Sequence, residues 1–553
     1  MFTVGSRVAD SESYKAPNVS VEQERKKRLM DLKKLAVRHG DLANTLKTGL
    51  MRRTLKFYEH NNNPVILALS DSQRLNDHIK EFFNETKVER TGDGFSSSGL
   101  TWYWASCVAI WALFAIVGSF VSAYSCSRFG SKNTMLLNNV LLLIGALLQS
   151  LCKPAKSYEM FFIGRLVIGV NNGICTSAGP IYLNEIAPTA IRGAVGVIFQ
   201  LNVVSGILVA QILGFDALLG SATLWPYLIG MNLVVGSVQL LTLPFCPDSP
   251  KFLLVIKGSR ERASKALRRL RGAEADIDKE MEEMIEEDRK EKEEPPVGYM
   301  NLLTVGYLRR PLIIACVLAM SQQLSGINAV FYYSSPIFRA SLPSHLLRDD
   351  PDFPKYMVSV AGAINLIFTV VAVFTIEPLG RRKSHIIGLS GMAVCALVVA
   401  ILLSGLEVND DQTCRGVTPT DATNYVSITL LLLSVAFFSI GPGPIPWVIT
   451  AEMFTSRPRP KAISIANTVN WLCNFAIALG FEPLINAICG WVFIIFAILL
   501  IIFIFYLAIK VPKTAGLSVQ DVVATFKLAQ GMRKNTEDEE QKKEEDDKRE
   551  TTF

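Results

Sequence analysis

GWVFIIFAILLIIFIFYLAIK, residues 490–510, is an apolar run that reaches its single charged residue, Lys510, only at its end. A helix of that length extends about 30 Å, which matches the hydrocarbon core of a bilayer. Ten earlier runs have a similar character, so the sequence predicts an all-α, polytopic membrane protein rather than a soluble one. A membrane β-barrel would show alternating segments of about ten residues instead. The ten earlier runs lie near 101–124, 134–152, 160–182, 193–217, 224–245, 311–337, 357–377, 385–406, 425–450 and 461–485.

The charged residues of this 553-residue chain concentrate outside the apolar runs and follow the topology of a membrane protein. The formal net charge of +6 comes from mixed charges at the joints, which the positive-inside rule explains better than nucleic-acid binding does. The rule places the basic joints and the block 246–310 in the cytosol. We therefore predict a multi-pass plasma-membrane protein. Its predicted parts are a polar amino-terminal tail with a vestigial span and an outer loop (1–100), a membrane half (101–245), a cytoplasmic helical linker (246–310), a second membrane half (311–510) and a disordered cytoplasmic tail (511–553).

Cysteine usage indicates neither a metal centre nor a redox motif. Most of the ten cysteines lie inside apolar runs, no CxxC pair occurs, and Cys414 is a polar-loop thiol without an obvious partner. We predict that all ten act as small apolar side chains and that the protein holds no metal or cofactor. The sequon Asn84-Glu85-Thr86 lies on the predicted outer side, which makes Asn84 a candidate for glycosylation.

The two halves of the membrane region repeat one another. Glu185 precedes Arg192 by seven residues, and Glu452 precedes Arg459 by the same seven. Two halves in one orientation indicate a transporter built from a parallel repeat. The second half has six runs and the first only five, so one span is expected near 45–85.

That region offers only the apolar stretch 64–69, which would rise about 9 Å as a helix. The cations Arg52, Arg53 and Lys56 make its insertion costly. Two readings stay open. Either residues 50–80 cross the membrane with help from their neighbours, or the amino-terminal tail is external.

Several strings in order resemble one family. They are GRLVIGV (164–170), PIYLNEIAPTAIRGAVG (180–196), PDSPKFLL (247–254), QQLSGINAVFYYS (322–334), LGRRK (379–383), GPGPIPWVITAEMF (441–454) and RPRP (457–460). The chain resembles the facilitative hexose transporters, the glucose-transporter branch of the sugar porters in the major facilitator superfamily. The resemblance implies the major facilitator fold, with two pseudo-symmetric six-helix halves, and passive transport by alternating access.

The departures from the family pattern keep other functions open. The first span is absent or vestigial, Ser131-Lys132 replaces two arginines, and Lys513 and Ser439 stand where acidic residues are usual. One alternative is a proton-coupled or polyol porter; another is a non-transporting sugar sensor or interaction protein. No acid lies centrally in any run, which favours uniport, and Gln323-Leu324-Ser325 resembles the glucose-type signature. An enzyme is not expected.

Amides inside the apolar runs are the candidate sugar ligands, because each offers a donor and an acceptor and polar groups are costly in a membrane. An isolated amide in a span more often joins helices. Gln322 and Asn328 would point about 120° apart on a straight helix, so we predict a break at Gly326. The resemblance assigns sugar hydroxyls to Gln200, Gln322, Gln323, Asn328, Asn365 and Asn470, and stacking to Trp447. The resemblance and the helix-breaking pattern assign gating to Tyr332, Tyr333, Gly441, Pro442 and Pro444.

Charges at the predicted inner ends of the spans form a second candidate group. The resemblance implies ion pairs between the halves when the cavity faces outward; anchoring by positive charge alone is the alternative reading. The members are Arg128, Arg165, Glu185, Arg192, Glu377, Arg381, Arg382, Glu452 and Arg459. The carboxyl end Thr551-Thr552-Phe553 fits a PDZ groove, so a PDZ protein is a candidate partner beside sugar and lipid.

Overall fold

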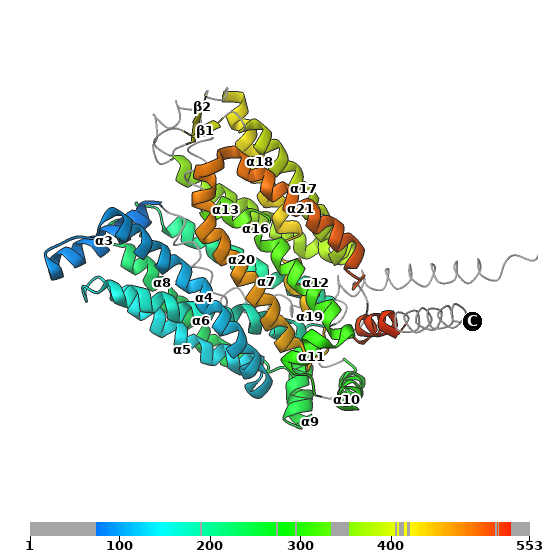
Figure 1. Ribbon diagram of the computed structural model, residues 1–553. Helices are drawn as coiled ribbons and strands as arrows, with labels where there is room; N and C mark the ends of the chain where they lie inside the picture. The colour runs from blue at the N-terminus through cyan, green and yellow to red at the C-terminus, as the bar shows by residue number, and fades with distance from the viewer. Residues whose placement is uncertain are drawn as a thin grey trace, which may run out of the picture. The chain divides into compact units, whose positions relative to one another are not determined.

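The computed structural model describes residues 73–188, 191–272, 275–293, 296–332, 353–403, 406–408, 414–416, 421–514, 517 and 519–531 (Figure 1). These residues belong to one unit of the chain, Thr54–Phe553. The predicted vestigial span upstream of residue 73, Tyr333 and the carboxyl end Thr551–Phe553 lie outside the described residues.

The first half is a set of long helices that follow the predicted apolar runs. They are α4 (Ser97–Phe129), α5 (Ser131–Ser150), α6 (Tyr158–Ile186), α7 (Arg192–Leu213) and α8 (Trp225–Thr242), preceded by the shorter α3 (Gln73–Thr91). Gly130 joins α4 to α5 with φ +84°, a conformation that glycine adopts without strain.

The second half repeats this arrangement with two broken helices. Its helices are α12 (Gly306–Gln323), α13 (Ile327–Tyr332), α16 (Phe353–Leu379), α17 (Arg381–Leu402), α18 (Asp421–Ile440), α19 (Ile445–Glu452), α20 (Arg459–Ile488) and α21 (Val492–Lys510). Gly380 joins α16 to α17 with φ +82°, just as Gly130 joins α4 to α5. The two equivalent joints of the predicted repeat therefore adopt the same backbone conformation.

Both predicted breaks are present. Gly326 has φ +88° between α12 and α13, so the predicted break at this residue is confirmed. Residues 441–444 form a turn between α18 and α19. The prolines of this stretch carry no N–H and interrupt the helical hydrogen-bond ladder.

Nine helices of the described chain are long and apolar enough to cross a membrane. Two predicted runs fall outside this set, and they correspond to α6 and to the broken pair α12–α13. Most side chains of α6 from Gly164 to Ile186 are buried against other helices, so this helix needs little apolar surface for lipid. Its polar residues are tolerated because they face protein.

The halves meet through two equivalent pairs of helices. α4 packs against α20, and α16 packs against α7 (Figure 1). When the predicted span upstream of residue 73 is counted as the first, α4 and α16 are the second helices of their halves, and α7 and α20 are the fifth. Each pair therefore joins the second helix of one half to the fifth helix of the other. Trp111 of α4 and Trp471 of α20 meet edge to face with ring centroids 5.0 Å apart.

The predicted cytoplasmic linker forms short charged helices. They are α9 (Arg260–Arg271), α10 (Ile277–Glu293) and α11 (Tyr299–Thr304), preceded by the π-helical turn η4 (Phe252–Ile256). Leu267 and Met281 are buried in a small apolar core between them. The segment therefore has its own packing and is more than a solvated connection.

Two predictions on the rest of the chain are wrong. The tail from residue 511 was expected to be disordered, but residues 519–531 form a helix. Its Val522 and Phe526, one turn apart, are buried, and the Lys527 ammonium lies 5.0 Å from the Tyr307 ring centroid. Cys489 is disulfide-bonded, so it is no simple apolar side chain.

A short β-hairpin lies on the connection between α17 and α18. Its strands, β1 (Leu406–Val408) and β2 (Cys414–Gly416), pair antiparallel.

A cluster of aromatic side chains lies where α3 meets the first membrane half. Helix α3 buries Phe82 and Phe83 among the ends of α4, α6 and α8. Phe83 contacts the rings of Tyr103, Trp104, Tyr158 and Phe161.

The aromatic cluster predicts a stability effect. Phe83 is fully buried, so Phe83→Ala leaves a cavity and should cost about 3–5 kcal/mol of packing free energy. Thermal unfolding of the detergent-solubilised protein should show a clear decrease in Tm. Val88→Ala, on the same helix at 43% exposure, is the matched control and should leave Tm nearly unchanged. Equal Tm values for both variants would contradict this packing.

Candidate functional site

Four of the predicted sugar ligands form one chain of hydrogen bonds in which every amide donates in the same direction. Asn328 Nδ2 donates to Gln323 Oε1. Gln323 Nε2 donates to Asn470 Oδ1 at 2.7 Å, and Asn470 Nδ2 donates to Gln322 Oε1 at 2.8 Å. Gln322 Nε2 then donates to the backbone carbonyl of Gly443 at 2.7 Å. We call these four side chains the amide chain.

The amide chain depends on both helix breaks. Gln322 and Gln323 are the last residues of α12, and Asn328 is the second residue of α13, so the turn at Gly326 brings them together. Gly443 lies in the break between α18 and α19, and its carbonyl is an acceptor only. This carbonyl therefore fixes which end of each amide donates along the chain.

Trp447 and Gln200 lie beside the same break. Trp447 of α19 meets Phe199 of α7 edge to face, with centroids 5.4 Å apart. Its buried indole Nε1 has no hydrogen-bond acceptor among the described residues, so the donor is available. Gln200 is buried on α7, and a Cβ added at Gly443 would lie 3.5 Å from its Nε2. The first half thus brings an aromatic ring and an amide to the break in the second.

Asn365 is buried but belongs to a separate contact. Its Oδ1 lies 2.7 Å from Ser439 Oγ, across the interface between α16 and α18. The same hydroxyl lies 2.7 Å from the Val435 carbonyl, and one proton can serve only one acceptor at a time. Ser439, noted as a departure from the family pattern, is therefore the partner of a predicted ligand.

The predicted gate is only partly described. Tyr332 ends α13, and its side chain lies outside the described part, as does all of Tyr333. In the second gate segment, Gly441 packs directly on Gly388 of α17: a Cβ on Gly441 would lie 2.7 Å from the Ser384 carbonyl. A Cβ on Gly388 would lie 2.5 Å from Pro442 Cδ. The break at 441–444 is thus held close to α17.

A cluster of charged groups joins the halves at the inner end: its hydrogen bonds reach α7 of the first half, and its ion pairs lie within the second half. Glu377 of α16 accepts from the N–H groups of Gly193 and Ala194 at 3.0 and 3.3 Å, so it caps the first turn of α7. Arg381 bridges Glu377 at 2.7 Å and Glu452 at 3.1 Å. We call Glu377, Arg381, Glu452 and the capped turn of α7 the inner lock.

The other predicted inner charges divide into two groups. Arg192 lies within electrostatic range of Glu452, and Arg459 within range of Glu185, so each arginine is attracted by an acid of the other half. Glu185 additionally accepts from Ser131 Oγ at 2.9 Å. Two residues make different contacts. Arg382 donates to the Ala508 carbonyl inside its own half, and Arg128 is exposed without an ion pair among the described residues.

The prediction for Arg165 is wrong. Arg165 lies twenty residues before Glu185 on α6, which is about 30 Å along the helix, so it cannot join the inner charges. Its Nε donates to the Cys107 carbonyl at 3.1 Å, and its guanidinium lies 5.8 Å from the Trp111 ring centroid. Arg165 instead connects α6 to α4 toward the other end of the bundle.

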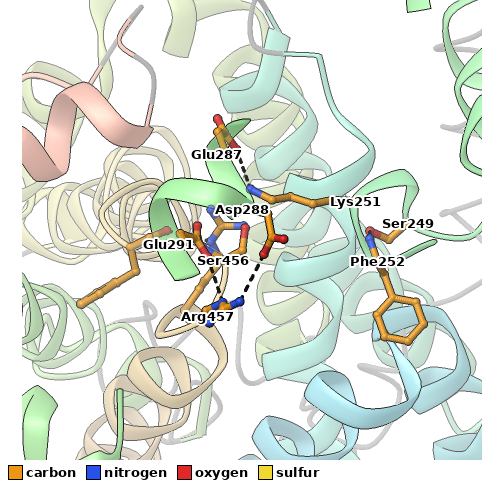
Figure 2. Close-up of polar contacts among 10 residues, drawn as sticks. Ser249, Lys251, Phe252, Glu287, Asp288, Glu291, Ser456 and Arg457 are labelled. Atoms are coloured by element: carbon orange, nitrogen blue, oxygen red, sulfur yellow. Dashed lines mark hydrogen bonds and ion pairs between the residues drawn. The ribbon is translucent and has the colours of Figure 1, made fainter. Parts of the chain in front are cut away.

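The linker adds a second connection at this end, shown in Figure 2. Lys251, just after the first half, pairs with Glu287 of α10 at 2.5 Å. Arg457, in the second half, pairs with Asp288 at 3.3 Å, and Ser456 N donates to Glu291 at 3.1 Å. One face of α10 therefore contacts both the chain that leaves the first half and a loop of the second half.

The sequence reasoning assigned no role to several groups that the structure adds to these sites; Asn474 is an amide of the tenth apolar run that received none. Asn474 Nδ2 lies 3.5 Å from Gln323 Oε1, and the Gly443 carbonyl terminates the amide chain. Asn467 of α20 donates to Ser177 of α6 at 2.8 Å, across the halves. Asn467 and Asn474 flank Asn470 on α20 at helical spacing, a signal that could have identified them. A backbone carbonyl leaves no such signal.

Asn84 has a structural contact in the folded chain. Its Oδ1 accepts from Phe95 N at 2.8 Å and braces the turn between α3 and α4. Thr86, the third residue of the sequon, is buried. Glycosylation of Asn84 stays a prediction.

The inner lock predicts a conformational effect of Gly193→Ala. The added methyl carbon would lie 2.4 Å from Arg381 Nη2 and 2.8 Å from Glu377 Oε1, so the lock must loosen. A loss of about 1.4 kcal/mol would shift the balance between closed and open inner ends about tenfold. Maleimide labelling of Val448→Cys in inside-out vesicles should become correspondingly faster. In the control, Gly480→Ala, the methyl meets nothing within 4 Å, and labelling should not change.

Comparison with known proteins gives one consistent result. The family described as "Sugar (and other) transporter" matches residues 46–526. The mouse solute carrier family 2 facilitated glucose transporter member 3 is 43% identical over 449 residues, covering 81% of this chain and 87% of that protein. Member 3 from human is 42% identical over 461 residues, covering 83% and 89%. Chicken member 1 is 40% identical, covering 81% and 88%.

Solved structures confirm the fold. The proton:xylose symporter XylE bound to 6-bromo-6-deoxy-D-glucose superposes with a TM-score of 0.69 at 22% identity, covering 85% of this chain and 96% of XylE. The inward-open form of the E. coli transporter XylE gives 0.58 at 22% identity, covering 86% and 99%. The predicted major facilitator fold is confirmed, and with the family match over most of its length the chain belongs to the sugar transporter family.

Proposed function

We propose that this chain carries a hexose passively across the plasma membrane and that glucose is its main substrate. The observation that carries the proposal is the amide chain, which lies at two helix breaks beside Trp447. The relatives named as facilitated glucose transporters support the substrate class.

The chemistry of the amide chain suits a neutral polyol. Each amide can exchange a neighbouring amide for a sugar hydroxyl, because a hydroxyl both donates and accepts. The amides satisfy one another in the absence of sugar, so the buried polar groups carry no large desolvation cost. Trp447 supplies an apolar face with a free indole donor at its edge, which suits the CH surface of a pyranose ring.

The placement of the acids favours uniport. On the described membrane helices, every Asp and Glu lies within about two turns of a helix end. These residues are Glu159, Glu185, Glu377, Asp421, Glu452 and Glu482. The carboxylates at the inner end cap α7 or face arginines, and none of the described acids lies beside the amide chain. A sugar can therefore bind here without a proton exchanged at a central carboxyl group.

Alternating access follows from the inner lock. Opening the inner end requires Glu377 to leave the first turn of α7 and the linker pairs on α10 to part. The Arg381 ion pairs are buried, so desolvation of the charges offsets much of their attraction, and the net free energy that holds the inner end closed is small enough for both states to be populated. Loss of the lock would favour the state in which the inner end is open.

Uptake of labelled glucose into proteoliposomes tests the site. Gln323→Leu leaves the Asn470 oxygen and an Asn328 N–H unpaired, so kcat/KM should fall at least about tenfold. Trp447→Ala should raise KM about tenfold through the lost ring contact. The matched controls are Gln239→Leu, a buried amide of α8, and Trp102→Ala, 72% exposed at the start of α4. Both controls should transport nearly as the parent does.

An imposed proton gradient tests the coupling. Saturable glucose uptake should be the same with the gradient, without it and with an uncoupler, because no described carboxyl group lies at the amide chain. Uptake that follows the gradient would instead make the protein a symporter. A folded chain that binds glucose but does not transport it would establish a sensor.

A further inference from the structure

Cys489 follows the last residue of α20 at a sharp corner and is disulfide-bonded. Its backbone has φ +47° and ψ −128°, and the 3₁₀ turn η5 (Cys489–Trp491) follows before α21 begins. The next residue, Gly490, lies against the end of α17: a Cβ there would be 2.5 Å from the Leu403 carbonyl. This corner therefore adjoins the point at which the chain leaves α17 for the hairpin.

We propose that the partner of Cys489 is Cys414, on strand β2 of the hairpin. The sequence has ten cysteines, and eight others on the described chain are free thiols, so Cys414 is the one that remains. The eight free thiols belong to Cys107, Cys126, Cys152, Cys175, Cys246, Cys316, Cys395 and Cys473.

The backbone places the two residues in one neighbourhood. Cys414 pairs with Val408 in the β1–β2 register. Strand β1 contacts both η5 and α20. β1 thus touches both the strand that carries Cys414 and the corner that carries Cys489, so the two residues lie on segments gathered around one strand. Disulfides join Cα atoms that are about 4.4–6.8 Å apart, a separation that such neighbouring segments can reach.

Formation of the bond requires an oxidising compartment. The two thiols lose two protons and two electrons, and one S–S bond forms. The electrons pass by thiol–disulfide exchange to the disulfide of a protein oxidoreductase, which becomes a dithiol. Such bonds persist on the outer side of the membrane and are reduced in the cytosol. The bond therefore marks the α20–α21 corner as external.

This assignment agrees with the charge pattern without depending on it. Ten membrane crossings separate α3 from the α20–α21 corner when each broken helix pair counts as one, so both lie on the same side. The sequon at Asn84 is then external as well. The bond also ties the α17–α18 connection to the α20–α21 corner, so four helix ends of the second half move together.

Labelling on intact cells tests the proposal with the full-length chain. In the parent protein, a membrane-impermeant maleimide should modify Cys414 and Cys489 only after treatment with a reductant. In Cys489→Ser, Cys414 should react without reductant; in Cys414→Ser, Cys489, which is 2% exposed, should react without reductant once the protein is denatured. Cys395→Ser and Cys473→Ser are the controls and should keep the parent pattern. Mass spectrometry locates each label.

A second measurement keeps the test independent of variant folding. The parent protein, alkylated under denaturing conditions and digested without reductant, should yield a peptide pair that contains both cysteines and is lighter by two hydrogens than the reduced pair. The two single variants and the double variant should share one lowered Tm, because each removes the same bond. Three outcomes would overturn the assignment: labelling of both thiols in the untreated parent, an oxidised Cys489 in Cys414→Ser, or a covalent dimer on a non-reducing gel.

Discussion

The hydrogen bond from Gln322 to the Gly443 carbonyl sets the direction of the polar site. An amide can donate or accept at either end, so four linked amides alone could adopt two opposite arrangements. A backbone carbonyl only accepts, and this one is held in place by the break between α18 and α19. The whole chain of amides is then oriented without a charged group. The break in turn depends on the close contact between Gly441 and Gly388, which sets the distance from α17.

The inner lock uses a different kind of contact. Glu377 meets backbone N–H groups at the start of α7, so one carboxylate satisfies donors that a helix end would otherwise leave open. Arg381 joins that carboxylate to Glu452, and α10 adds a separate contact to each half. In the carrier proposed above, the neutral amides bind the substrate, and the charges at the inner end set the balance between its two conformations.

The sequence predicted most of the membrane fold and much of the site. Apolar length identified the spans, and the repeated Glu–Arg spacing identified the two halves. The breaks followed from Gly326 and from the prolines of 441–446. Other features had no local signal. Arg165 was misplaced because its helix enters from the opposite side. The helix at 519–531 depends on Val522 and Phe526 docking, and the Gly443 carbonyl becomes visible only when distant helices meet. The disulfide at Cys489 was missed because Cys489 lies in a four-residue joint between two predicted runs and is flanked by Ile488 and Gly490, neither of which marks a polar loop.

The paired contacts α4–α20 and α7–α16 have a mechanical consequence. They are one type of contact used twice, related by the pseudo-twofold symmetry of the repeat. When one half rotates against the other, both contacts must therefore move together, and the motion is that of a rocker switch. Such a rocker has a single axis, and a gap that widens at one membrane face must narrow at the other. A simultaneous opening at both faces, which would leak solute freely, is disfavoured by the geometry itself.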